Sequence, residues 1–263
     1  MGHRGNARFR YVWELYDGSK DWSQANDLAK QMPEKLRELQ RLWLMEALKY
    51  NVLPLDDRRV ERFDSNLAGR PQLVKGNSQL LFGGMGRLFE NAVLVMKNKS
   101  YSITAEVEVP SKGAEGVIIH QGGAFGGMSL YAKNGKAKFA YNFFGLETST
   151  MEAAQPIPAG KHQVRMEFVY DGGGLGKGGN GSLFYDGKKV GGGRIERTVP
   201  MAFSLDETTD VGRDSGTAVS KDYTPQTSHF TGKVKWVQID LGKDDHNHYI
   251  KPEERLNLAM ARQ

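Results

Sequence analysis

Regular alternation of apolar and polar residues is the feature that most constrains the fold of this chain. In the stretch Ser100–Pro110, apolar side chains occupy the odd positions from Tyr101 to Val109, and Ser, Thr and Glu occupy the even positions between them. Successive side chains of a β-strand point to opposite faces. The stretch therefore predicts a strand with one buried face and one face in contact with solvent.

The same alternation returns further along the chain, with glycine-rich and turn-forming segments in between. It predicts strands at Lys136–Phe144, Lys161–Tyr170, Gly181–Val190 and Phe230–Leu241. Short alternating strands separated by turns are typical of antiparallel sheets. We expect a mainly β protein, an antiparallel concanavalin-like (jelly-roll) β-sandwich preceded by an N-terminal amphipathic helix segment.

The helix is predicted at Pro33–Tyr50, where proline suits the first helical position. Leu36, Leu39 and Trp43 follow at spacings of three or four and form one apolar stripe. Four further apolar residues widen the stripe beyond what packing on one neighbour needs. The helix is therefore expected either to lie between two bodies of structure or to pack on the sandwich, with Leu36, Leu39 and Trp43 as candidate interface residues.

Four segments are expected along the chain. Residues 1–57 hold a strand, a turn and the long helix, and residues 58–72 form a connector. The β-sandwich spans residues 73–242, and the tail 243–263 holds a short helix at Pro252–Met260.

Composition excludes some classes of site. The net charge is +5, but Lys and Arg alternate with Asp and Glu without a block of like charge, so no nucleic-acid partner is indicated. The chain has 0 Cys, which excludes disulfides, thiolate metal sites and a cysteine nucleophile. No apolar run approaches the ~18 residues of a membrane span. The N-terminal residues also lack the apolar core of a signal peptide, and the compartment stays open.

Several short motifs carry little chemistry. The glycines of Gly174–Gly179 fit G-x-G-x-x-G, but a strand rather than a helix is expected after them, so they predict a flexible hairpin loop. His246 and His248 supply too few ligands for a metal site. No serine lies in a G-x-S-x-G turn.

Candidate ligand-binding residues lie near the predicted loops. Exposed aromatic rings can stack on sugars, and Tyr141, Phe143 and Phe144 share one predicted strand, although part of this set must be core. His120 and Gln121 precede a pair of glycines at a loop mouth. Carboxylates of a loop-rich acidic segment could bind a ligand or simply form turns. The candidate ligand contacts are therefore His120, Gln121, Tyr141, Asp210 and Asp214.

Several motifs resemble the closing region of bacterial arylsulfatases. Trp13–Asp17 reads W-E-L-Y-D, Asn26–Ala29 contains N-x-L-A, and Pro33–Leu36 reads P-E-K-L before a long helix. Tyr50–Asp57 continues in the same manner, and Asp210–Asp214 with Phe230–Gly232 resembles the C-terminal region of the family.

The resemblance implies the C-terminal part of a sulfuric ester hydrolase without its catalytic half. Sulfatases use a formylglycine from a [C/S]-x-P-x-R motif and a calcium ion. Neither that motif nor any catalytic or metal-binding residue can be placed on this chain, so no cofactor is expected here. The chain alone is expected to be inactive, with a sulfatase catalytic domain or a second copy as helix partner. A glycan- or partner-binding sandwich and a structural assembly domain are the alternatives.

Overall fold

A computed structural model describes residues 12–53, 55 and 73–244. The chain forms two compact units, Met1–Asp57 and Arg58–Ala261, apart from the last two residues. The connector predicted at 58–72, the tail helix at Pro252–Met260 and the pair His246 and His248 lie outside the described residues.

The first unit contains one helix, α1, at Pro33–Lys49. Trp43 of this helix packs against Trp13, with ring centroids 5.5 Å apart. Leu36 and Trp43 are half-buried, and Leu39 is exposed. Two of the three candidate interface residues thus lie on the partly covered side of the helix.

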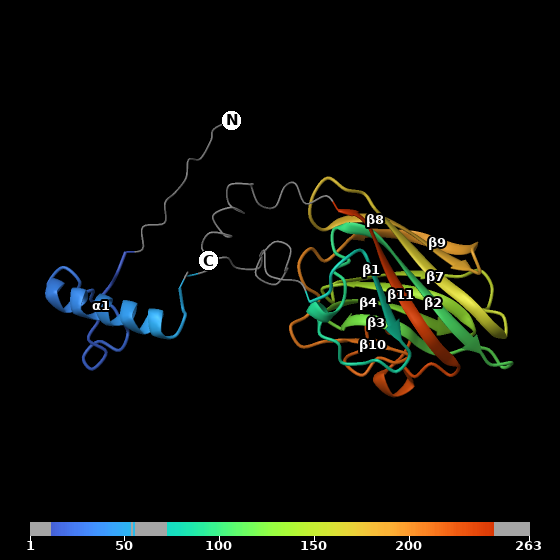
Figure 1. Ribbon diagram of the computed structural model, residues 1–263, viewed down its shortest axis with the longest axis horizontal. Coiled ribbons are helices and arrows are strands. Elements are labelled where there is room, and N and C mark those ends of the chain that lie inside the picture. Colours follow the sequence, from blue (N-terminus) through green and yellow to red (C-terminus); the bar gives the residue numbers. More distant parts are fainter. Residues whose placement is uncertain (1–11, 54, 56–72, 245–263) are drawn as a thin grey trace. The chain divides into compact units, whose positions relative to one another are not determined.

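The second unit is a sandwich of two antiparallel sheets (Figure 1). Alternating segments of the chain contribute strands to the two layers. The six-stranded sheet has the order β1 (Ser78–Phe82), β11 (Lys233–Asp244), β2 (Lys99–Val109), β7 (Gly160–Tyr170), β8 (Lys177–Tyr185) and β9 (Lys188–Arg197). The five-stranded sheet has the order β10 (Thr209–Val211), β3 (Gly116–Gly123), β4 (Gly126–Lys133), β5 (Lys136–Phe143) and β6 (Glu147–Glu152). The predicted fold class is confirmed.

The main hydrophobic core fills the space between the two sheets. The odd residues of β2, from Tyr101 to Val109, all belong to this core, as the alternation predicts. A second, smaller apolar cluster consists of Val117, Tyr131, Ala140 and Tyr223. Tyr131 and its neighbour Leu130 point to opposite faces of β4, and Leu130 belongs to the main core. The second cluster therefore lies on the outer face of the five-stranded sheet, beneath the segment 212–232.

Two of the predicted strand boundaries that differ from the structure do so for the same physical reason. Gly181–Val190 is not one strand, because Asp186 and Gly187 have φ of +47° and +80° and turn the chain between β8 and β9. Phe144 does not belong to β5, because Phe144 and Gly145 have φ of +53° and +72° and begin the turn to β6. Paired residues with positive φ form the tight turns that match the twist of a hairpin.

The glycines at 174–179 are only partly a loop. β7 ends at Tyr170 and β8 already begins at Lys177, so Gly178 and Gly179 lie within a strand. The next elements are the strands β8 and β9 rather than a helix.

Candidate functional site

Two hairpin turns at one end of the five-stranded sheet expose large apolar side chains. The β3–β4 turn carries Phe125, whose side chain is 73% exposed. The β5–β6 turn carries Phe144 and Leu146, which are 43% and 82% exposed. β3 and β5 both flank β4 in antiparallel pairs, so both strands run toward the same end of the sheet. We call Phe125, Phe144 and Leu146 the turn patch.

The two turns touch each other through their backbones. A Cβ atom added at Gly145 would lie 3.0 Å from the carbonyl oxygen of Ala124. A Cβ added at Gly126 would lie 3.8 Å from the backbone nitrogen of Phe144. The absence of side chains at both glycines lets the two turns that carry the turn patch approach each other closely.

Asn142 ties the two turns together from below. Its Nδ2 donates to the carbonyl oxygen of Ala124 at 3.0 Å, and its Oδ1 accepts from the backbone N–H of Gly145 at 2.8 Å. The side chain is buried. One amide thus bridges both turns, which fixes the turn patch on a rigid base.

Polar groups border the turn patch on two sides. Phe143 lies beside Phe144, with ring centroids 4.9 Å apart, and the guanidinium of Arg197 lies 5.1 Å from the centre of the Phe143 ring. Arg197 also pairs with Glu147 at 2.7 Å. On the other side, Thr217 Oγ1 accepts from the backbone N–H of Ala124 at 2.8 Å and donates to Glu207 Oε1 at 2.6 Å. Exposed apolar area with a polar border is typical of an interaction site.

Three of the predicted site residues meet in a buried polar cluster. His120 of β3, Asp210 of β10 and Asp214 after it are all 0% exposed. His120 Nε2 lies 3.2 Å from Asp210 Oδ2 and 3.6 Å from Asp214 Oδ1, while Nδ1 lies 3.1 Å from the carbonyl oxygen of Gly122. Both ring nitrogens thus lie within hydrogen-bond distance of oxygen atoms in the interior.

The pKa values of the two carboxyl groups, Asp210 and Asp214, are shifted in opposite directions. Burial opposes ionisation of Asp210, but hydrogen bonds from His120, from Ser215 and from the backbone N–H of Arg87 outweigh it and hold the pKa of Asp210 well below its usual range. Burial raises the pKa of Asp214 above its ordinary value, although hydrogen bonds oppose this shift.

The buried cluster holds the segment 212–232 against the outer face of the sheet. Asp214 Oδ2 accepts from the hydroxyl of Tyr223 at 2.9 Å and from the backbone N–H of Val219 at 3.4 Å. The same segment supports the turns, because Thr217 receives a hydrogen bond from Ala124 and the carbonyl oxygen of Val219 accepts one from Asn142 at 3.4 Å. The cluster therefore positions the turn patch without contacting solvent.

Tyr141 and Gln121 face the interior of the sandwich. The hydroxyl of Tyr141 accepts from the backbone N–H of Val199 at 2.9 Å, and burial raises the pKa of Tyr141 well above its ordinary value. Gln121 pairs with Met128, a core residue, and its amide has no hydrogen-bond partner among the described residues. All five predicted ligand contacts are buried, so their direct contact with a ligand stays a prediction.

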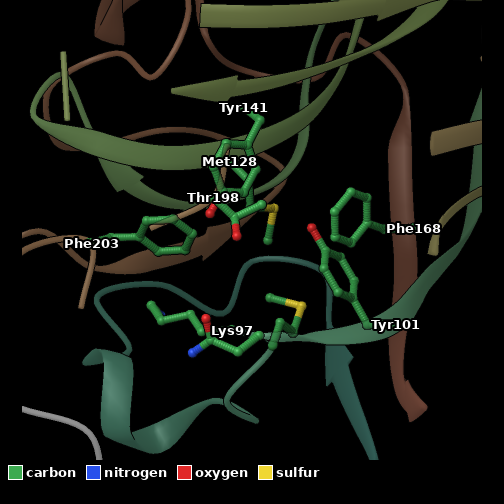
Figure 2. A pocket seen from close by; sticks show the side chains of 9 residues that line it. Lys97, Tyr101, Met128, Tyr141, Phe168, Thr198 and Phe203 are labelled. Carbon is green, nitrogen blue, oxygen red and sulfur yellow. The ribbon is translucent and has the colours of Figure 1, made fainter. Parts of the chain in front are cut away.

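A small cavity lies between the sheets near the turns. Its lining comes from both sheets and from two connecting segments, and Figure 2 shows the side chains converging on it. It is lined by Met96, Lys97, Asn98, Tyr101, Met128, Tyr141, Phe168, Thr198 and Phe203. Its volume of about 10 Å³ is enough for one water molecule. A sugar or other small ligand does not fit there.

Neither a metal centre nor a membrane span is found in the described parts of the chain. No group of three or more His, Asp or Glu there could hold a metal ion. None of the helices there is long and apolar enough to cross a membrane.

Sequence reasoning missed the main features of this site. It named Phe143 and Phe144 as aromatic candidates but assigned Phe144 to a strand, and it did not name Phe125. The available signal was the segment Gly122–Gly127, in which glycine pairs flank Ala124 and Phe125. A large aromatic residue between glycine pairs marks a tight turn with an exposed ring.

Comparison with known proteins shows a likeness of fold at low sequence identity. No protein-family model and no curated protein matches the sequence. The structure is similar to the Ruminococcus gnavus IT-sialidase CBM40 bound to α2,3 sialyllactose, with 13% identity over 73% of this chain and 99% of that chain and a TM-score of 0.42. It is also similar to the SAP-like pentraxin of Limulus polyphemus (12% identity, 64% and 78% of the two chains, TM-score 0.37). Domains LG4-5 of the mouse laminin α1 chain give 13% identity over 64% of this chain and 40% of that chain, with a TM-score of 0.36.

These findings overturn the resemblance to arylsulfatases. The similar structures are a carbohydrate-binding module, a pentraxin and laminin domains, and nothing among them points to a sulfatase. The motifs that suggested a sulfatase are short and local. Pro33–Leu36, for example, begins a helix with residues that suit any helix N-terminus, and Glu34 and Lys35 are exposed. Likeness at these identities and TM-scores concerns the fold and transfers neither a ligand nor an activity.

Proposed function

We propose that the β-sandwich binds a glycan at the turn patch. The observation that supports this most strongly is the exposure of two phenylalanine rings on adjoining, rigidly braced turns. Sugar rings carry apolar C–H faces that pack on aromatic rings, and hydroxyl groups at their edges that form hydrogen bonds. The turn patch offers both kinds of contact, because Phe125 and Phe144 lie beside the polar borders Arg197–Glu147 and Glu207–Thr217.

The rigidity of the turns favours binding. The close contact of the two turns at their glycines and the hydrogen bonds of Asn142 fix the backbones that carry Phe125 and Phe144 before a ligand binds. Little conformational entropy is then lost on association, which helps a small contact area to bind a sugar. The ligand is expected to cover the outside of the turns rather than to enter the sandwich.

Alanine substitutions test the proposal directly. Phe125→Ala and Phe144→Ala are each expected to weaken binding to a glycan selected on an array by about fivefold or more, since one aromatic contact contributes about 1 kcal/mol. Isothermal titration calorimetry measures the change. Both side chains are exposed, so the melting temperature is expected to stay within a few degrees of the parent.

Phe82→Ala is the matched control. Phe82 is also an exposed phenylalanine, but it lies on β1 at the edge of the other sheet. Its substitution is expected to leave glycan affinity unchanged. Equal losses in all three variants, or no loss in either turn variant, would rule out the turn patch as the binding site.

A further inference from the structure

The helical unit cannot bury its own apolar residues. Ala47 is the one buried hydrophobic residue among the described residues of this unit. Trp13 covers one side of α1 through its contact with Trp43. A lone helix of this length is marginal in water and gains most of its stability from packing. The uncovered side of α1 therefore calls for a partner.

The uncovered side carries a defined stripe. Glu38, Leu42, Met45 and Lys49 follow at spacings of four, three and four, which places them along one face of the helix. Leu42 and Met45 are 47% and 61% exposed, and Leu48 beside them is 63% exposed. Leu42 and Met45 also line a shallow surface hollow with the charged residues before them on the helix. We call Glu38, Leu42, Met45 and Lys49 the helix stripe.

The helix stripe is complementary to itself in the antiparallel direction. Leu42 and Met45 lie symmetrically about the midpoint between residues 43 and 44, and so do Glu38 and Lys49. A two-fold axis through that midpoint pairs Leu42 of one copy with Met45 of the other. The same axis places Glu38 of each copy opposite Lys49 of its mate, so an apolar centre is closed at both ends by opposite charges.

We infer that two copies of this chain associate through an antiparallel pair of α1 helices along the helix stripe. The existing ion pairs do not oppose this arrangement, because Glu38 pairs with Lys35 and Lys49 with Glu46 on the exposed helix surface, where such pairs contribute little. Trp43, on the covered side of the helix, keeps its packing on Trp13.

The interface is small, so the association is expected to be weak and reversible. Two helices of 17 residues cover less area than a standard protein interface, which is typical of weak, transient contacts. A dimer carries two copies of the sandwich. Where the proposed glycan site is correct, binding to a multivalent surface would gain from the second site.

A charge-swap experiment on the full-length chain tests the pairing. Sedimentation equilibrium across about 1–300 µM is expected to show a monomer–dimer equilibrium for the parent. Glu38→Lys and Lys49→Glu, made singly, each place like charges opposite one another at both ends of the helix pair, and each is expected to weaken dimerisation about tenfold. The double variant restores opposite charges and is expected to return to within about threefold of the parent.

The double variant separates dimer contacts from helix stability. The double variant loses both ion pairs within the helix, so an effect on helix stability alone would give it the weakest dimerisation of the three variants. The inferred contact between copies predicts instead that it dimerises more strongly than either single variant. Met45→Glu is expected to abolish the dimer. A monomer across the whole range, a dimer that tolerates Met45→Glu, or cross-links from Lys49 to the sandwich of a monomer would overturn the inference.

Discussion

At the scale of single residues, Asp214 shows how this protein accommodates a buried carboxyl group. Its carboxyl group is 0% exposed and is surrounded by donors from His120, Tyr223 and two backbone N–H groups. Removal of a buried acceptor leaves each donor without a partner, which costs more than the lost hydrogen bond itself. Asp214 is therefore expected to matter for stability even though it contacts no solvent.

Asp214→Ala is expected to destabilise the folded chain by about 2–4 kcal/mol, because it removes the acceptor of the backbone N–H groups of Gly216 and Val219 and one hydrogen-bond partner of Tyr223 in the interior. Urea denaturation measures the change. Asp206→Ala, at an exposed aspartate of the same region, is the control and is expected to change stability by less than about 0.5 kcal/mol. Similar effects of the two substitutions would contradict the bracing role of the buried cluster.

His162 provides a test of pH dependence. Its Nδ1 donates to Asp186 Oδ2 at 2.7 Å, and this hydrogen bond raises the pKa of His162 above its ordinary value of 6.5. The group stabilises the fold fully below pH 6.5, and that stabilisation is lost as the pH rises through the higher pKa of the folded state. The parent is thus expected to lose stability relative to His162→Gln between about pH 6 and pH 8.

Unfolding free energies measured across this range check the prediction. His229→Gln, at an exposed histidine, serves as the control and is expected to follow the parent. Parallel curves for the parent and His162→Gln, or a parent that gains stability with rising pH relative to the variant, would show that the hydrogen bond has no such effect.

Sequence reasoning identified the residues of the buried cluster but not their surroundings. Their position near predicted loops predicts that His120, Asp210 and Asp214 contact a ligand. His120 and Asp210 are 90 positions apart, and their contact arises only because β3 and β10 pair in the folded sheet. Burial of this kind depends on long-range pairing and on the segment 212–232, neither of which has a local signal in the sequence.

At the scale of structural elements, the turns depend on glycine. Gly122 has φ of +79°, and a Cβ there would lie 2.2 Å from the carbonyl oxygen of Gly126. Gly187 also has a positive φ, +80°, but no atom lies within 4 Å of an added Cβ. The two positions therefore separate the cost of the backbone conformation from the cost of a collision with backbone.

Gly187→Ala is expected to cost about 1 kcal/mol for the left-handed conformation alone. Gly122→Ala is expected to cost at least about 2 kcal/mol more than that, because the β3–β4 hairpin must open to admit the methyl group. Differential scanning calorimetry of both variants measures the gap. Equal melting temperatures for the two variants would contradict the close contact at the base of the β3–β4 turn.

Alternating patterns predicted some elements well and missed others. The sequences of β2, β5 and β7 alternate between polar and apolar residues, and their predicted bounds lie within one residue of the observed ones. β3 and β4 are buried along almost their whole length, so no alternation marks them. β1 and β10 are short, with 5 and 3 residues, and offer too few positions for a pattern to emerge.

At the scale of the whole molecule, fold class followed from the sequence and function did not. The spacing of strands and turns predicted an antiparallel sandwich because several strands, such as β2 and β7, alternate between polar and apolar residues and are separated by turns. The resemblance to sulfatases was wrong because it rested on short local motifs, both around the helix and at Asp210–Asp214 and Phe230–Gly232. The proposed glycan site also has no linear motif, since Phe125 and Phe144 come together only through the approach of two glycine-containing turns.

The most direct test of glycan binding at the turn patch is to locate a bound sugar by NMR. Backbone amide shifts of the ¹⁵N-labelled chain are followed during titration with a sugar selected on an array. Binding at the turn patch predicts that the amide shifts of Ala124–Gly127 and Phe144–Glu147 change. The shifts of residues around the small interior cavity, such as Tyr101 and Phe168, are expected to stay unchanged. Shift changes centred on another surface, or the absence of binding to any glycan, would contradict it.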